Sequence, residues 1–326
     1  KQFPIDAQAA GDTGQGGPDL PQSGSYGLVG RRWESGLIER MLQQTPVVIL
    51  SGDTGVGKTE LALRLANWTQ KTGAKEKPGG VFYTPFEVGA GLERVVHEIG
   101  TTVAGLDFAD LPAPSQRSWV VDYLQERPAL LVWDSAERIG GFPHGESLGL
   151  LESQEQAELN EFLKEACSTG GTSALLVSRS NQLPWLTVPH QGLELEGLNG
   201  GDRLELGGLI LESLSSNRAP QSGSGVPQTP ESNLGAGYLE LMELVEGHPL
   251  TMQIALPLLK EIRGSVVAGE LQSRIAELQA SPAASNQGDR EDARPDFLTA
   301  AMDYSFSRMP RRTRTHLPFL SLFQRR

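Results

Sequence analysis

Short apolar runs alternate with amphipathic segments between residues 31 and 195. Apolar runs of this length are typical of buried strands in a parallel sheet, which is covered on both faces. They lie at Pro46–Leu50, Val81–Thr84, Ala129–Asp134, Ser173–Ser178 and Leu193–Leu195. Apolar residues at helical spacing fill Arg31–Leu42, Lys58–Thr69, Leu92–Val103, Ser115–Glu126 and Ser153–Ala166. Strands that alternate with helices predict a three-layer α/β fold around a parallel sheet.

After Leu195 the pattern predicts helices only. They are expected at Asp202–Ser213, Gly237–Val245, Leu250–Ile262, Ala268–Leu278, Pro295–Phe306 and Arg311–Phe323. Stretches rich in Gly, Pro, Ser and Gln have the composition of linkers, and they lie at residues 1–26, 215–236 and 281–294. The predicted organisation is a linker over 1–26, an α/β domain over 27–200, a helical domain over 201–280 with a flexible insertion at 215–236, a linker over 281–294, and the start of a further domain over 295–326.

Charge and composition limit the classes of partner. The chain has 326 residues, a net charge of −12 and a pI of about 5.0, which argues against nucleic-acid binding by the surface as a whole, since that needs clustered Lys and Arg. The exception is the locally basic tail, with Arg311, Arg312, Arg314, Arg325 and Arg326. No apolar run approaches the roughly 18 residues of a membrane span, so no membrane association is expected.

Three features concern the cysteine content, the expected location and the ends of the chain. Cys167 is the single cysteine, so an intrachain disulfide is excluded and a small buried thiol is expected. No signal peptide is visible, and a cytoplasmic location is expected. The chain begins at Lys1 and ends in an apolar segment, so we expect it to be an excised part of a longer protein.

The stretch GDTGVGKT matches the pattern G-x-x-x-x-G-K-[ST] between a predicted strand and a predicted helix, as a phosphate-binding loop requires. In such a loop, backbone N–H groups cradle the phosphates, and the helix N-terminus adds partial positive charge. Lys58 would reach the β- and γ-phosphates, and Thr59 would bind Mg²⁺. The residues expected around the nucleotide are Gly52, Thr54, Gly55, Val56, Gly57, Lys58, Thr59 and Glu60.

A carboxylate for Mg²⁺ is expected at the end of a neighbouring strand. Asp134 ends the apolar run ALLVWD and is the residue predicted for this role. Many ATP-hydrolysing proteins place a second acid directly afterwards, but this chain has Ser135 there. Glu137 is the nearest candidate for the base that orients water, and the alternative is that Glu137 is a solvated acid opening the next helix. Hydrolysis is accordingly expected to be slow, if it occurs.

The strand Val81–Thr84 lies in sequence between the loop strand and the Asp134 strand. This arrangement resembles the P-loop class whose parallel sheet has the order 5-1-4-3-2. The Asn-Lys-x-Asp signature that reads guanine is absent from the sequence, which favours adenine and therefore ATP or ADP with Mg²⁺.

Further motifs resemble those of the STAND class of signal-transduction ATPases, which includes NB-ARC and NACHT proteins. The segment YGLVGRRW resembles the family's Val-Gly-Arg motif, which lies over the adenine, and this implies roles for Val29, Gly30 and Arg31. SALLVSRS resembles the family's fourth strand, and Arg179 matches its γ-phosphate sensor. EGHPL resembles the Gly-x-Pro segment, in which Pro249 would pack against the adenine.

The resemblance covers about residues 27–262 and implies a molecular switch. ADP would hold a resting state, and ATP would drive self-association. It also implies an effector module before residue 1, a sensor region after residue 326, and a winged-helix domain that begins in 295–326. In EGHPL, His248 takes the variable middle position and is expected to be a cap or contact residue. Three alternatives stay open: an AAA+-like DNA-loading ATPase, a metabolic kinase, and a degenerate nucleotide-binding scaffold.

Overall fold

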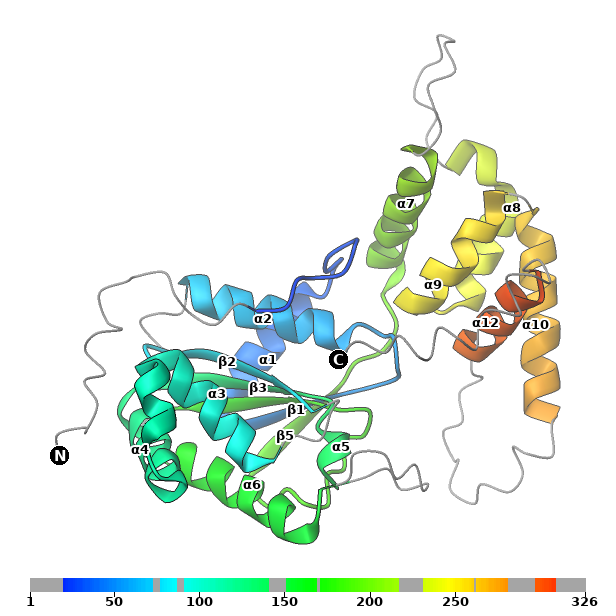
Figure 1. Cartoon of the computed structure of the whole chain (residues 1–326). Helices are drawn as coiled ribbons and strands as arrows, with labels where there is room; N and C mark the ends of the chain where they lie inside the picture. The colour runs from blue at the N-terminus through cyan, green and yellow to red at the C-terminus, as the bar shows by residue number, and fades with distance from the viewer. Residues whose placement is uncertain are drawn as a thin grey trace. The chain divides into compact units, whose positions relative to one another are not determined.

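The computed structural model describes residues 20–72, 77–86, 91–140, 151–168, 171–216, 231–260, 262–280 and 297–308. The chain divides into two compact units, Lys1–Glu196 and Gly197–Arg326. Each unit is described by itself below, with its elements labelled as in Figure 1.

The first unit is built on a five-stranded sheet. Its strands are β1 (Val47–Ser51), β2 (Gly80–Pro85), β3 (Ala129–Asp134), β4 (Ser173–Val177) and β5 (His190–Glu194). The order is β2-β3-β4-β1-β5, and every paired strand is parallel to its neighbour. This confirms the predicted order 5-1-4-3-2. Because β4 lies between β1 and β3, the carboxyl ends of these three strands meet at one edge of the sheet.

The fifth strand begins earlier than the sequence predicted. It starts at His190, whereas the apolar pattern indicated Leu193–Leu195, and Leu195 follows its last residue. The residues of β5 alternate between exposed and half-buried positions, because this strand pairs only with β1 at the edge of the sheet. A search for buried apolar runs therefore missed its first half.

Helices cover both faces of the sheet, as Figure 1 shows. One face carries α1 (Arg32–Gln44) and α2 (Lys58–Thr72), whose Ile38 and Leu61 pack with Val48 of β1. The other carries α3 (Leu92–Ala104), α4 (Ala113–Glu126) and α6 (Ser153–Ala166), with the shorter η2 (Leu106–Asp110) and α5 (Glu137–Gly140). There Trp119 and Phe162 pack in one cluster with Ile49 of β1. Successive residues of β1 thus serve opposite faces, which gives the predicted three layers.

The second unit is helical over the part that the structure describes. Its elements are α7 (Gly200–Ser216), α8 (Glu231–Leu244), α9 (Pro249–Ala255), η3 (Leu256–Lys260), α10 (Gly264–Ala280) and α12 (Phe297–Arg308). The side chain of Asn199 caps α7 by accepting from the backbone N–H of Asp202 at 3.1 Å and donating to its carboxylate at 2.9 Å. None of the helices described in either unit is both long and apolar enough to cross a membrane.

Four expectations for the second unit need correction or fall outside the described residues. Helix α8 begins at Glu231, so the last residues of the predicted insertion 215–236 are helical. The predicted helix Leu250–Ile262 is two elements, α9 and η3, because Pro257 lacks the N–H that an α-helix interior needs. The predicted helix Arg311–Phe323 and the linker 281–294 lie outside the described residues.

Candidate nucleotide-binding site

The loop between β1 and α2 adopts a conformation that its glycines make possible. Gly52, Gly55 and Gly57 all have positive φ, at 140°, 87° and 103°. Gly52 is also packed against the chain after β5, because a Cβ added to it would lie 2.5 Å from the backbone oxygen of Leu195. Only glycine meets both requirements at this position without strain. The glycines of the motif therefore occupy positions where the backbone at the carboxyl end of β1 has positive φ or lies close to another segment.

Lys58 opens α2 and folds back over the loop. Its Nζ donates to the backbone oxygens of Gly52 at 2.7 Å and Asp53 at 2.8 Å. Burial lowers the pKa of Lys58 below its ordinary value of 10.5, and the nearby charges of Glu137 and Asp134 partly oppose that shift. A desolvated cation at a helix N-terminus is suited to bind an anionic ligand, whose negative charge would balance that of the ammonium group.

Thr59 and Asp134, which are 75 residues apart in sequence, meet at the mouth of the loop. The Thr59 hydroxyl donates to Asp134 Oδ2 at 2.9 Å, and Asp134 is only 6% exposed. Oxygen donors of this kind suit Mg²⁺, which usually takes one or two carboxylates together with phosphate oxygens. The two residues predicted as metal ligands therefore lie together and fit the ion.

The same carboxylate has partners that the sequence did not indicate. The Tyr83 hydroxyl donates to Asp134 Oδ2 at 2.8 Å, and the backbone N–H of Ser135 donates to Oδ1 at 2.9 Å. Tyr83 belongs to β2, and its register partner in β3 is Val132, two residues before Asp134. No sequence motif indicates Tyr83, because its hydrogen bond to Asp134 depends on β2 being the strand next to β3.

A tight turn after β3 brings Glu137 to the end of β4. Ser135 is left-handed, with φ at 60°, and the N–H of Ala136 donates to Val177 O at 2.8 Å. The Glu137 carboxylate accepts from the backbone N–H of Arg179 at 3.3 Å, and its Oε1 lies 3.5 Å from Arg179 Nε. Glu137 does open α5, as one alternative had it, but it is buried rather than solvated. Two residues predicted separately are therefore an ion pair.

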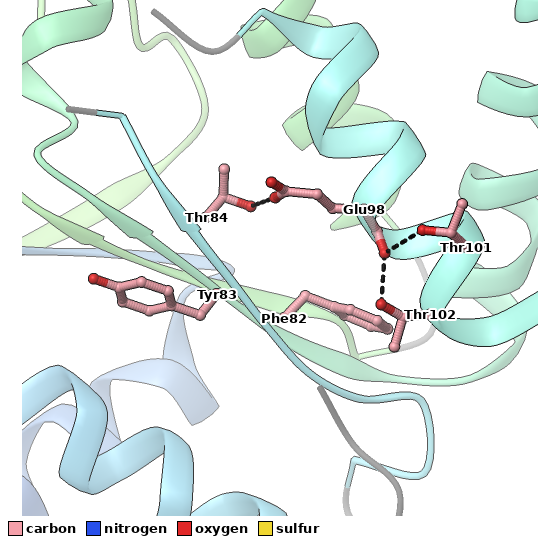
Figure 2. Close-up of a pocket in the computed structure, with 6 residues that line it drawn as sticks. All are labelled: Phe82, Tyr83, Thr84, Glu98, Thr101 and Thr102. Carbon is pink, nitrogen blue, oxygen red and sulfur yellow. Dashed lines mark hydrogen bonds between the residues drawn. The ribbon is translucent and has the colours of Figure 1, made fainter. Parts of the chain in front are cut away.

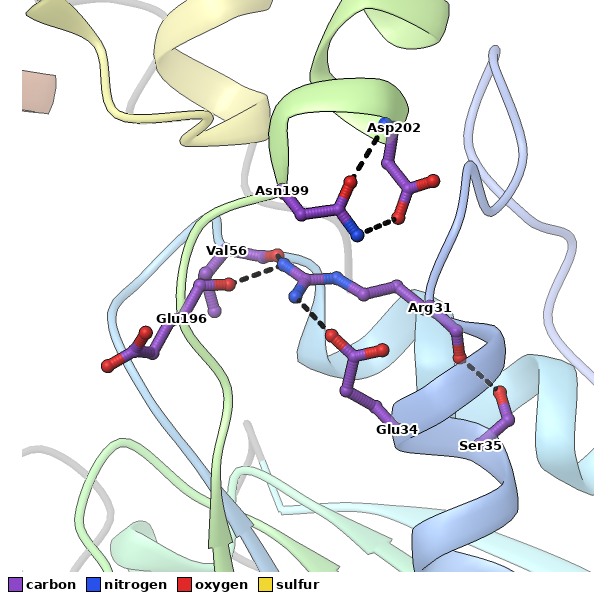
Figure 3. Close-up of polar contacts among 7 residues, drawn as sticks. All are labelled: Arg31, Glu34, Ser35, Val56, Glu196, Asn199 and Asp202. Atoms are coloured by element: carbon purple, nitrogen blue, oxygen red, sulfur yellow. Dashed lines mark hydrogen bonds and ion pairs between the residues drawn. The ribbon is translucent and has the colours of Figure 1, made fainter. Parts of the chain in front are cut away.

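Arg31 braces the loop from the other side (Figure 3). Its guanidinium donates to Val56 O in the loop at 3.2 Å and to Glu196 O after β5, and pairs with Glu34 at 2.9 Å. Arg31 is 3% exposed and left-handed, with φ at 62°. Val29 is buried, and Gly30 has φ at 67°. The guanidinium of this predicted nucleotide contact is therefore engaged with the protein's own carbonyls.

Glu60 connects the loop helix to the segment before α1. Its Oε1 accepts from the backbone N–H of Gly24 at 2.8 Å. Gly24 belongs to the stretch predicted as a linker, and Leu20 packs beside the apolar cluster under α1 and α2. For Glu60, a predicted nucleotide contact, the structure shows a bond to the protein's own backbone.

Pro249 lies in the second unit as the first residue of α9. His248 caps that helix, because its side chain accepts from the N–H of Thr251 at 3.2 Å. Gly247 has φ at 71°, and a Cβ there would lie 2.2 Å from Leu198 O. The Gly-His-Pro segment is thus a helix start with a backbone that requires glycine, and the adenine contact of Pro249 stays a prediction.

A separate pocket of about 210 Å³ lies between β2 and α3 (Figure 2). Its lining residues are Phe82, Tyr83, Thr84, Glu98, Thr101 and Thr102. The Thr84 hydroxyl donates to Glu98 Oε2 at 3.2 Å, while Thr101 and Thr102 donate to backbone oxygens of α3. None of the residues predicted to bind nucleotide lines this pocket.

Comparison with known proteins agrees with the fold. Residues 31–143 match the family model described as an AAA domain. A Walker-type ATPase of Pyrococcus abyssi has a TM-score of 0.51 and 14% identity, over 80% of this chain and 77% of that chain. A STAND protein with a tetratricopeptide repeat sensor from Pyrococcus horikoshii has a TM-score of 0.44 and 17% identity, over 80% of this chain and 35% of that chain.

The Aeropyrum pernix ORC2 protein in its ADP form has a TM-score of 0.46 and 17% identity, over 87% of this chain and 71% of that chain. No curated protein has a significantly similar sequence. The sheet order, the loop and the AAA-domain match together assign the α/β P-loop NTPase fold. The chain therefore has the fold of a P-loop NTPase and carries the phosphate-loop motif at the expected place in it.

Proposed function

We propose that this chain binds adenine nucleotide with Mg²⁺ and acts as the nucleotide-dependent switch of a STAND-type ATPase. The observation that carries the binding proposal is the contact between Thr59 and Asp134 at 2.9 Å. It joins the phosphate loop to the carboxylate of β3 at the place where a P-loop protein holds its metal. When bound, Mg²⁺ would neutralise charge on the β- and γ-phosphates. Thr59 and Asp134 are the residues that would hold it.

The protein's own cations would respond to the phosphates. Lys58 would exchange its two backbone oxygens for phosphate oxygens, which offer full charge to a desolvated ammonium. Arg179 is half exposed and paired with the buried Glu137. A γ-phosphate near Arg179 would compete with Glu137 for the guanidinium, and ADP would not. Arg179 would thus distinguish ATP from ADP, and release of Glu137 would free a carboxylate to orient water.

Switching requires that the two nucleotides stabilise different arrangements of the protein. We propose that ADP favours a resting monomer and that ATP favours self-association, with Pro249 contacting the adenine in the resting state. The support for this class is the order of motifs along the chain, from Val29–Arg31 through the loop, Asp134 and Arg179 to Pro249. Turnover is expected to be slow, because Ser135 takes the position of the usual second acid.

The first experiment is to identify the nucleotide that the purified protein carries, by denaturation and chromatography. Lys58→Ala is the test variant, and Lys71→Ala is its matched control, because Lys71 is an exposed lysine of the same helix. We expect nearly stoichiometric ADP in the wild type and in Lys71→Ala, and none in Lys58→Ala. Light scattering after exchange into a non-hydrolysable ATP analogue should show self-association. Persistent monomers with that analogue would contradict the switch while leaving nucleotide binding intact.

An AAA+-like DNA-loading ATPase is the second candidate, and the AAA-domain match over residues 31–143 favours it. The net charge of −12 argues against it. Binding of labelled duplex DNA across a salt series distinguishes the two, since phosphate contacts give an affinity that falls steeply with salt concentration. ATP-dependent, salt-sensitive DNA binding would support the loader and exclude the signalling switch.

A further inference from the structure

Tyr83 is placed on the face of the sheet that carries the phosphate-loop helix. Successive strand residues point to opposite faces, and in Figure 2 the Tyr83 ring lies across the strand from Thr84 and Glu98. Tyr83 packs against the apolar cluster of α1 and α2, which contains Leu61. From there its hydroxyl reaches Asp134 Oδ2, beside the Thr59 hydroxyl on the same oxygen. An aromatic residue of β2 therefore has a direct bond to the proposed metal ligand of β3.

The two hydroxyls that donate to Asp134 Oδ2 would respond differently to bound Mg²⁺. Thr59 is a proposed Mg²⁺ ligand, and a hydroxyl oxygen that binds a metal ion turns its lone pair toward that ion. Tyr83 lies on the neighbouring strand β2, and its rigid ring sets the distance of its hydroxyl from the backbone. It can keep its bond to the carboxylate while Thr59 turns. Ser135 holds the other oxygen through its backbone N–H at 2.9 Å.

We propose that Tyr83 is a positioning residue that orients the Asp134 carboxylate for Mg²⁺. The inference rests on the proposed nucleotide binding and goes beyond it, because no motif or matched family property assigns a part to Tyr83. Loss of a group that orients a metal ligand typically weakens metal affinity about 10- to 100-fold. Tyr83→Phe should therefore raise the Mg²⁺ concentration for half-maximal nucleotide binding by about tenfold or more.

The test titrates Mg²⁺ into the full chain with a fluorescent ADP analogue and repeats the binding measurement in EDTA. Tyr123→Phe is the matched control. The Tyr123 hydroxyl donates at 3.2 Å to the backbone oxygen of Gly79, the residue before the first residue of β2. This variant therefore also loses one tyrosine hydrogen bond in the same unit. We expect Tyr83→Phe to shift the Mg²⁺ titration and to leave affinity in EDTA within twofold of wild type. Tyr123→Phe should shift neither.

A double-mutant cycle with Asp134→Asn tests whether Tyr83 acts through that carboxylate. In the Asp134→Asn background, Tyr83→Phe should add no further loss of Mg²⁺-dependent binding. An unshifted Mg²⁺ titration in Tyr83→Phe, or equal weakening with Mg²⁺ and in EDTA, would overturn the positioning role. If the wild type binds the analogue no better than Lys58→Ala does, the proposed function itself fails and the inference fails with it.

Discussion

Replacing Arg31 by alanine tests whether this residue holds the nucleotide site together before any nucleotide arrives. The guanidinium is buried and donates to Val56 O in the phosphate loop and to Glu196 O beyond β5. Alanine removes both donors and leaves two backbone oxygens without that partner. It also removes the ion pair with Glu34.

The expected loss follows from these contacts. A hydrogen bond from a charged donor contributes about 1.5 to 3 kcal/mol, so two of them at the low end give about 3 kcal/mol. The partly exposed pair with Glu34 adds at most about 1 kcal/mol. Arg31→Ala should therefore lower the free energy of unfolding by about 3 to 4 kcal/mol. Arg31→Lys should lie between Arg31→Ala and wild type, because a single ammonium does not reproduce the planar fork.

Urea unfolding of nucleotide-stripped protein, followed by circular dichroism, measures this loss directly. Arg32→Ala is the control, because Arg32 is the next residue and is exposed; its effect should stay within about 0.5 kcal/mol of wild type. If Arg31→Ala is as stable as Arg32→Ala, the bracing role is wrong. Arg31 would then contribute only to nucleotide binding, and Arg31→Ala would lower nucleotide affinity without lowering the free energy of unfolding.

Three further predictions concern ionisable groups that are buried or half-buried. Lys58→Met should stabilise the nucleotide-free protein at neutral pH. Burial lowers the pKa of Lys58 in the folded protein, so the unfolded chain binds more protons than the folded one and wild-type stability rises with pH. The stability advantage of Lys58→Met, measured by thermal scans, should therefore shrink toward pH 10.5. Glu137→Gln should lower ATP turnover about 100-fold with nucleotide affinity retained, if Glu137 orients water; unchanged phosphate release would place the base elsewhere. Cys167 is half-buried, whereas a buried thiol was expected from the sequence. Desolvation still raises its pKa to about 12, so a disulfide reagent at pH 8 should modify native protein at least about 100-fold more slowly than urea-unfolded protein. Equal rates would contradict the raised pKa.

Local chemistry in the sequence was sufficient for the main features of the fold. The loop motif needs glycines for its backbone path and Lys-Thr for phosphate and metal, so its residues are contiguous and recognisable. Asp134 could be predicted because it directly follows the apolar residues Leu130–Trp133 of a predicted strand. Alternation of strands and helices predicted the parallel sheet, and the resemblance to a P-loop class predicted its strand order. By contrast, the start of the edge strand β5 was predicted three residues too late, because its half-exposed alternation gives a weak apolar signal.

The contacts between distant residues were decided only by the tertiary structure. Arg31 binds carbonyls 25 and 165 residues away, and a backbone oxygen leaves no mark in the sequence of its partner. Glu137 pairs with Arg179 because the left-handed turn at Ser135 directs it to β4. Tyr83 reaches Asp134 because β2 and β3 are neighbours in register. The sequence by itself determined which residue types make up the candidate site, since the motif depends on residue types at short spacing. The packing of the strands determined which other side chains contact those residues.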